Sequence, residues 1–335
     1  MLRILVRGMA VFIVLVFLAG MNLASTPAAA QGPGAPLLGK PGPPEEKKEE
    51  EKKEETPSTC GPLISDTCLP IDTHKASMQL LWGYSLVGGN FSPNWRRVSA
   101  KGDFSTFFSS VKFSYGPAKD LETYIVVPYI HNFAGNVHAD LAGPNGERSA
   151  NYGGIGDISF ISKYLLLPET EVRPAITGVA GVGFPSGHAS HLNPGRLGQD
   201  GVGAGAFTFT TGVNLFKYLK PFLIHGQIWY NTPVNLFPAR DDSVRSRDFV
   251  TFNLAAEYPI TKRWVALLEF YSSWTWTNIS TPQGFQSPST LLGVLPGIEF
   301  FVTEKWALSA GAAIDLAGKG GSFKYTPLFT VYRNF

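Results

Sequence analysis

The side chains best placed for chemistry in this chain are charged and polar residues set among apolar ones. Each lies in a stretch of alternating apolar and polar residues, on the polar side. They are Lys112, Lys163, Asn214, His225, Gln227, Asn253, Glu257, Glu269 and Glu299. Because an unpaired buried charge is costly, such groups either brace a filled interior as ion pairs or line a water-filled conduit as a polar constriction. The sequence leaves these two interpretations open.

Motifs for enzymatic chemistry are incomplete. The segment Gly83–Val87 resembles a nucleophile elbow but ends in valine where glycine is needed. The segment Gly181–Gly183 lacks a glycine three positions later, so it does not complete a dinucleotide-binding loop. His188 and His191 have no adjacent Asp, Glu or Cys, which favours solvated loop residues over metal ligands. We therefore predict no catalytic residue, no metal site and no cofactor.

The elements that must position the polar residues are β-strands. From Ala76 onward, twelve segments alternate apolar and small or polar residues, as transmembrane β-strands do. They are residues 76–86, 104–115, 121–131, 157–166, 174–184, 205–217, 221–231, 249–258, 264–270, 292–300, 306–316 and 323–335. In lipid every backbone amide needs an internal partner, so strands span only as a closed sheet. We predict an all-β fold, a closed antiparallel transmembrane β-barrel of about twelve strands.

The connections between these segments alternate in length. The short ones are residues 116–120, 168–173, 217–221, 259–263 and 302–305. The long ones are residues 87–103, 132–153, 185–204, 232–247, 275–288 and 317–322. Bacterial outer-membrane barrels have short periplasmic turns and longer extracellular loops, whereas a soluble β-sandwich has no reason to alternate in this way.

Composition argues against other classes of protein. Charged residues make up 16% of the chain, against about 25% in an average soluble protein, and aromatic residues at 13% are too many for disorder. The net charge is +2, so no basic field points to a nucleic-acid partner. After the first thirty residues, no apolar stretch is long enough for a membrane-spanning helix.

The first thirty residues have the layout of a secretory signal peptide. Arg3 and Arg7 precede the apolar run Ala10–Gly20, and Ala28–Ala30 supplies the small residues of a cleavage site. The apolar run is too short to span a bilayer. We therefore predict that residues 1–30 are removed and that the chain is exported to the cell outer membrane of a Gram-negative-type envelope.

Two further segments precede the barrel, which we place at residues 76–335. Residues 31–58 are rich in Gly and Pro and then in Glu and Lys, which predicts a disordered linker. Residues 59–75 form a pre-barrel segment. Two cysteines in an exported chain suggest a disulfide and are too few for a zinc site, so we expect Cys60 and Cys68 to be bonded. The sequence leaves open whether this segment enters the lumen as a plug.

Several short motifs resemble those of a known family. They are Gly156-Asp157-Ile158 with Lys163-Tyr164, Phe184-Pro185-Ser186-Gly187, His225-Gly226 and Glu257-Tyr258-Pro259-Ile260-Thr261. Over about residues 120–335 the chain resembles the outer-membrane barrels of the family named for the MetA pathway of phenol degradation. The resemblance implies a transporter-like outer-membrane barrel, and the family name implies passage of aromatic or other apolar compounds.

The C-terminus resembles the signal by which the barrel-assembly machinery recognises outer-membrane barrels. Phe329, Val331 and the terminal Phe335 supply outward apolar and aromatic side chains, whereas Arg333 departs from the pattern. The resemblance implies that the barrel-assembly machinery is a partner of this chain, beside outer-membrane lipid.

These observations predict a channel or transporter in which small molecules, aromatic or apolar ones included, pass passively through the barrel. Two alternatives remain open. Ser and His are both present, so an outer-membrane lipid hydrolase is compatible with the sequence although no local constellation singles out a pair. A plugged barrel would instead act as a structural or interaction protein. Conductance and lipase assays separate these three functions.

Overall fold

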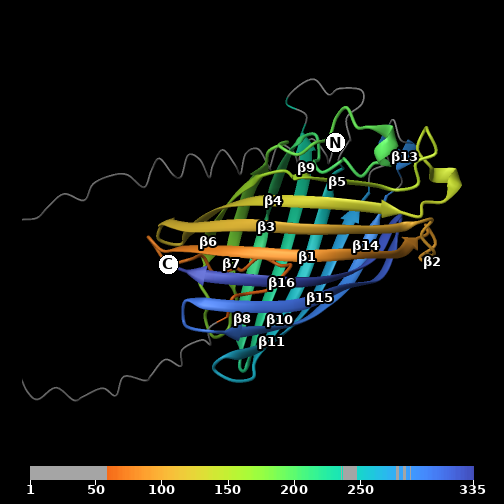
Figure 1. Ribbon diagram of the computed structural model, residues 1–335. Helices are drawn as coiled ribbons and strands as arrows, with labels where there is room; N and C mark the ends of the chain where they lie inside the picture. Colours follow the sequence, from red (N-terminus) through yellow and green to blue (C-terminus); the bar gives the residue numbers. More distant parts are fainter. Residues whose placement is uncertain (1–58, 235, 237–246, 277–278, 282–283, 287) are drawn as a thin grey trace, which may run out of the picture.

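The structure is a computed structural model that describes residues 59–234, 236, 247–276, 279–281, 284–286 and 288–335. The predicted signal peptide and linker, residues 1–30 and 31–58, lie outside the described residues. Twelve long strands form a closed antiparallel barrel, as predicted (Figure 1). They are β1 Ala76–Phe91, β3 Asp103–Ala118, β4 Leu121–Gly135, β6 Ser159–Leu167, β7 Ala175–Gly183, β8 Phe207–Leu219, β9 Phe222–Val234, β10 Phe249–Pro259, β11 Trp264–Thr275, β14 Thr290–Phe301, β15 Trp306–Lys319 and β16 Gly321–Asn334.

Short elements lie in the long connections. They are β2 Arg97–Val98, β5 Ala150–Ile155, β12 Ile279–Thr281, β13 Gly284–Gln286 and the 3-10 turns η1 Ala139–Leu141 and η2 Pro194–Arg196. Among the residues that the structure describes, no helix is long and apolar enough to cross a membrane.

The barrel closes between its first and last strands. β1 pairs antiparallel with β16, from Ser77 opposite Asn334 to Phe91 opposite Gly321. The amide of Phe335 adds a hydrogen bond to the carbonyl of Ala76 (2.9 Å). Closure gives the edge groups of both strands a partner, which an open sheet in lipid could not do. The C-terminus therefore lies at the end of the barrel that carries the short turns (Figure 1).

The alternation in the sequence separates an outward apolar face from an inward face. On β10, Phe252 and Leu254 are exposed, while Asn253 and Glu257 are buried. Exposed aromatic residues lie near strand ends beside the short turns, among them Tyr115, Tyr258, Trp264 and Trp306. Such a girdle is typical of barrels whose outer surface contacts lipid.

Leu254→Arg is expected to destabilise the barrel in a bilayer by about 2–4 kcal/mol, because a cation in the middle of β10 must lie in hydrocarbon. Ile260→Arg, in the exposed short turn after β10, is the control, with an expected cost of about 0–1 kcal/mol. Urea unfolding in lipid vesicles measures both free energies. Equal costs would contradict a lipid-facing β10.

One membrane span consists of two segments. β4 pairs with β6 along Leu121–Val126 and with β5 along Tyr129–Ala134. The break falls at Gly156–Ile158, opposite Pro128, which has no amide hydrogen to continue a regular ladder. The predicted loop 132–153 is consequently shorter than expected, because β4 and β5 extend the barrel into it.

The inward face is not uniformly polar. Apolar side chains from seven strands meet in one cluster, which we call the apolar collar. It consists of Leu81, Phe108, Ala255, Leu267, Tyr271, Leu295, Ala313 and Leu328. Leu63 and Ile64, from the segment that precedes β1, pack against it. The core of the barrel therefore includes residues from outside the strands.

Candidate functional site

We call residues 59–75 the plug. Residues 59–71 lie inside the barrel at its short-turn end, and residues 72–75 are exposed where they lead into β1. The plug contains no helix or strand. Its backbone and side chains form hydrogen bonds with inward residues of β3, β4, β6, β7, β8, β9, β11 and β14. The pre-barrel segment therefore enters the lumen, a question that the sequence left open.

One side of the plug is bound by carboxylates. Glu269 on β11 accepts hydrogen bonds from the amides of Leu63 (2.5 Å), Ile64 (3.1 Å) and Ser65 (2.9 Å). The Ser65 hydroxyl donates a further bond to it (2.9 Å). Glu299 on β14 accepts from the amide of Cys60 (3.1 Å). A buried carboxylate needs such donors, and here the backbone of the plug supplies them.

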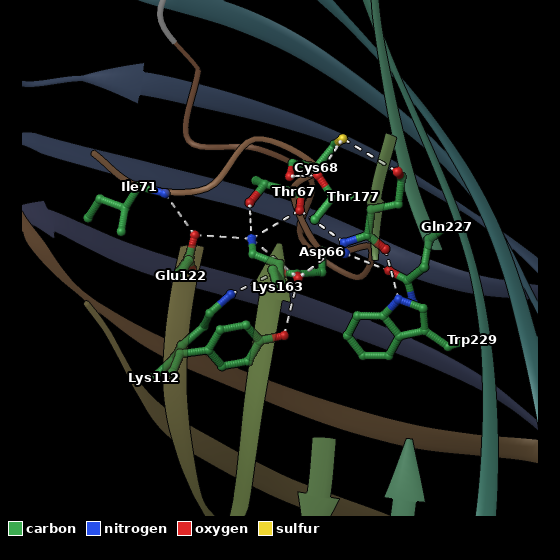
Figure 2. A network of polar contacts seen from close by, with 12 residues as sticks. Asp66, Thr67, Cys68, Ile71, Lys112, Glu122, Lys163, Thr177, Gln227 and Trp229 are labelled. Carbon is green, nitrogen blue, oxygen red and sulfur yellow. Dashed lines mark hydrogen bonds and ion pairs between the residues drawn. The ribbon is translucent and has the colours of Figure 1, made fainter. Parts of the chain in front are cut away.

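The other side of the plug faces two lysines. The Asp66 carboxylate accepts hydrogen bonds from Lys112 Nζ (2.8 Å) and Tyr124 Oη (3.1 Å). Its second oxygen lies 3.5 Å from Nζ of Lys163, which is fully buried (Figure 2). Asn214 Nδ2 also donates to Asp66 (3.3 Å). We call this arrangement of Lys112, Tyr124, Lys163 and Asn214 around the carboxylate the Asp66 site.

Further contacts surround the Asp66 site. Lys163 Nζ donates to the carbonyl of Thr67 (3.0 Å) and forms an ion pair with Glu122 on β4 (3.2 Å). Glu122 in turn accepts from the amide of Ile71 (3.0 Å). The amide of Asp66 donates to Gln227 Oε1 (2.6 Å). The plug backbone between Asp66 and Ile71 is thus bound to charged and amide side chains of the wall (Figure 2).

Charge fixes the orientation of the plug. The amides of Cys60 and of Leu63, Ile64 and Ser65 face Glu299 and Glu269, while the one inserted carboxylate, Asp66, faces the lysines. Burial alone would raise the pKa of Asp66, but Lys112 and Lys163 lower it to about 2. Asp66 is therefore ionised at neutral pH and pairs with the ammonium groups. A reversed plug would leave charges of both signs unpaired, which is costly in a buried site.

The polar residues singled out in the sequence fall into two groups. Lys112, Lys163, Asn214, Gln227, Glu269 and Glu299 contact the plug. His225, Asn253 and Glu257 are buried but form no hydrogen bond or ion pair with the plug among the described residues. His225 Nε2 lies 3.5 Å from Glu257 Oε1, and the Glu257 carboxylate accepts no hydrogen bond from the described residues. Asn253 Oδ1 accepts from the amide of Ser272 on β11 (3.3 Å).

Sequence reasoning missed Asp66, Glu122 and Tyr124. Asp66 lies in the pre-barrel segment, where only a disulfide was predicted. Glu122 lies at the start of a strand in which apolar and polar residues alternate only weakly. The available signal was electrostatic. Lys112 and Lys163 were predicted to point inward, and a buried ammonium group needs a carboxylate partner. This requirement indicated the Asp and Glu residues that had no predicted role.

The disulfide predicted between Cys60 and Cys68 is absent, because both residues are free thiols. The Cys60 amide is bound at β14, whereas Cys68 Sγ lies 3.2 Å from Thr177 Oγ1 on β7. Four strands, β8 to β11, separate β7 from β14 around the barrel. A disulfide requires Cα atoms within about 7 Å, so a plug held at both walls keeps the thiols apart.

Cys68 is expected to react slowly with alkylating reagents in the folded protein. Burial raises its pKa to about 11, which lowers the thiolate fraction at neutral pH on the order of 100-fold relative to a free thiol. Mass spectrometry after timed alkylation of the Cys60→Ser variant measures the rate, with urea-unfolded protein as the control. Equal rates in the two samples would contradict a docked plug.

Two cavities meet at the tip of the plug. One, of about 550 Å³, reaches Asp66 and Lys112. The other, of about 650 Å³, is lined by collar residues and by β14, β15 and β16. Leu63 and Ile64 line both. These two side chains, which pack against the apolar collar, therefore lie between the two cavities.

One solved structure has a similar fold, and two others are similar at lower scores. The COG4313 outer membrane channel from Pseudomonas putida F1 is similar with a TM-score of 0.61 at 13% identity, over 80% of this chain and 97% of that chain. The translocator domain of autotransporter NalP from Neisseria meningitidis has a TM-score of 0.46 at 12% identity, over 79% of this chain and 90% of that one. The toluene transporter TbuX from Ralstonia pickettii has a TM-score of 0.40 at 9% identity, over the same shares.

No curated protein matches the chain. A family model described as "Putative MetA-pathway of phenol degradation" matches residues 86–326. This range runs from β1 to β16 and so takes in nearly the whole barrel. The chain therefore belongs to the MetA-pathway of phenol degradation family.

Proposed function

We propose that the protein is an outer-membrane channel for the passive passage of small apolar molecules, aromatic compounds included, and that the plug closes it in the described state. The observation that carries this proposal is the apolar collar, with a cavity on each side and two plug side chains between them. A solute that replaces Leu63 and Ile64 in the collar would move from one cavity to the other.

The chemistry of the collar supports an apolar solute. The lumen of a general porin is polar and water-filled, because hydrated solutes pass through it. Here leucines and Phe108 occupy inward positions of several strands, where a hydrated solute would lose its water without replacement. The transfer of an apolar solute from water to the same surface lowers its free energy. The family name, which refers to phenol degradation, agrees with an aromatic solute.

The position of the plug supports a gate at the periplasmic side. In outer-membrane barrels the short turns face the periplasm, so the plug and the C-terminus would lie there. Phe329 and Phe335 are exposed on the outside, which agrees with recognition by the barrel-assembly machinery. Val331, the third residue of the expected signal, is partly buried. Export would depend on the predicted signal peptide, residues 1–30.

Solute uptake tests this proposal. Vesicles with a lipopolysaccharide outer leaflet and the full-length protein are expected to take up 2-phenylethanol faster than vesicles without it, while glucose uptake stays unchanged. Leu328→Asn, which places an amide in the collar, is expected to slow 2-phenylethanol uptake. Equal stimulation of glucose and 2-phenylethanol would indicate a polar pore, and no stimulation of either would refute a channel.

A further inference from the structure

We infer that the Asp66 site binds the solute when the plug withdraws, and that it selects small monocarboxylates with an apolar body. This inference rests on the proposed channel function, because the plug must withdraw, and it assigns a ligand class to the cavity on the short-turn side of the apolar collar. It starts from the donors that now hold Asp66. These donors are Lys112, Tyr124, Lys163 and Asn214, which come from four strands and converge on one carboxylate. Figure 2 shows the two lysines beside Asp66.

The donors are fixed before any solute arrives. With the plug docked, Lys163 and Asn214 are fully buried and Tyr124 is nearly so, and two contacts within the wall hold them without the plug. The Asn214 amide is oriented by a hydrogen bond from Trp229 Nε1 to its oxygen (2.8 Å). Lys112 Nζ lies 3.9 Å from the centre of the Tyr124 ring, which holds the ammonium over an aromatic face. Little conformational freedom remains to be lost when a second carboxylate takes the place of Asp66.

The charge of the site favours a monoanion. With the plug docked, Lys112 and Lys163 are balanced by Asp66 and Glu122. Withdrawal removes Asp66 and leaves one excess positive charge in a buried site, a costly state. One carboxylate restores the neutral net charge of the site. A dianion would make the net charge negative. Glu269 and Glu299, which lose their hydrogen bonds from the plug amides, would also repel a dianion from the opposite wall.

The cavity beside the site accepts an apolar body. Its volume is about 550 Å³, whereas a cavity of about 150 Å³ already holds benzene. Besides Asp66 and Lys112, the apolar and aromatic side chains Val126, Ile161, Phe216, Leu223 and Trp229 line this cavity. A ring or branched chain attached to the carboxylate would therefore leave water for an apolar wall.

The plug itself carries both features of this solute. Asp66 fills the carboxylate position while Leu63 and Ile64, a few residues away, fill the collar. Solute and plug therefore compete for the same donors. Removing the plug carboxylate should strengthen solute binding, an outcome that a misfolded variant cannot produce.

Calorimetric titration of the full-length protein in detergent tests the inference, with benzoate as the probe. Benzamide is the uncharged analogue and phthalate the dianion. Asp66→Asn is expected to tighten benzoate binding by about tenfold or more, the effect of one charge-assisted contact. Lys112→Met, in either background, is expected to weaken it by about the same factor. Lys101→Met, which removes an exposed lysine paired with Asp140, is the matched control and should change nothing.

Benzoate binding that is tighter in Asp66→Asn, weaker in Lys112→Met and stronger than that of benzamide and phthalate would support the inference. Equal affinities for benzoate and benzamide, or no change in Asp66→Asn, would overturn it. Conductance separates this failure from that of the channel. An Asp66→Asn protein that conducts without preferring benzoate refutes only the solute class. One that binds benzoate while no plug variant conducts refutes the channel and retains the carboxylate site.

Discussion

Glu269→Ala is expected to raise the ion conductance of the full-length protein in planar bilayers by about tenfold or more. Glu269 accepts hydrogen bonds from three consecutive plug amides, at 2.5 to 3.2 Å. A hydrogen bond to a charged group contributes about 1.5–3 kcal/mol, so losing several of them shifts the docked plug toward release by about 100-fold or more. The barrel wall itself keeps its backbone pairing.

Glu257→Ala is the matched control for this result. Glu257 is equally buried and lies on the adjacent strand β10, but among the described residues its carboxylate accepts no hydrogen bond from the plug. The conductance of the Glu257→Ala variant is expected to stay within about twofold of that of the unchanged protein, since no hydrogen bond to the plug is lost. If Glu257→Ala opened the channel as much as Glu269→Ala, the cause would be a weakened wall, and the role of Glu269 in holding the plug would be refuted.

Lys163→Met is expected to lower the free energy of unfolding by about 3–5 kcal/mol, because it leaves two buried carboxylates, Asp66 and Glu122, without their shared cation. Urea unfolding of the detergent-folded barrel, followed by tryptophan fluorescence and by heat-modifiable migration, measures the loss. The double variant Lys163→Met with Asp66→Asn removes one of the two carboxylates and is expected to recover part of it.

Lys101→Met provides the comparison for a surface ion pair. Lys101 Nζ lies 3.3 Å from Asp140, a distance close to that between Lys163 and Glu122, but both side chains are mostly exposed. Solvent screens such a pair, so its loss should leave the free energy of unfolding almost unchanged. Equal losses in the two lysine variants would contradict a buried network that holds the plug.

The barrel was predictable from the sequence because lipid imposes a strict pattern. Outward residues such as Phe252 and Leu254 must be apolar, and the intervening Asn253 is then read as inward. The break between β5 and β6 was not predictable from alternation, since it depends on Pro128 in a different strand. The alternation along a strand shows which residues share one face of the sheet. It does not show which residue of the neighbouring strand each of them pairs with.

The site was predictable only in part. Inward charges such as Glu269 and Lys163 follow from their place in the alternation. Their partners lie in the plug, which has no periodic pattern, so neither its path nor the pairing of Asp66 can be read from spacing. The disulfide was wrong for the same reason. Proximity of Cys60 and Cys68 in the chain suggested a bond, but contacts with opposite walls decide where each thiol lies.

The chain order of the plug has a consequence for biogenesis. The plug precedes every strand, yet Thr59 bonds to Glu299, 240 residues later. Contacts so distant along the polypeptide form late, because long loops must be ordered before such contacts stabilise them. The plug can reach its docked position only after nearly all strands of the barrel have paired. A barrel whose assembly stopped before its last strands paired would therefore lack a docked plug and would let solutes through. The channel closes when the wall is complete.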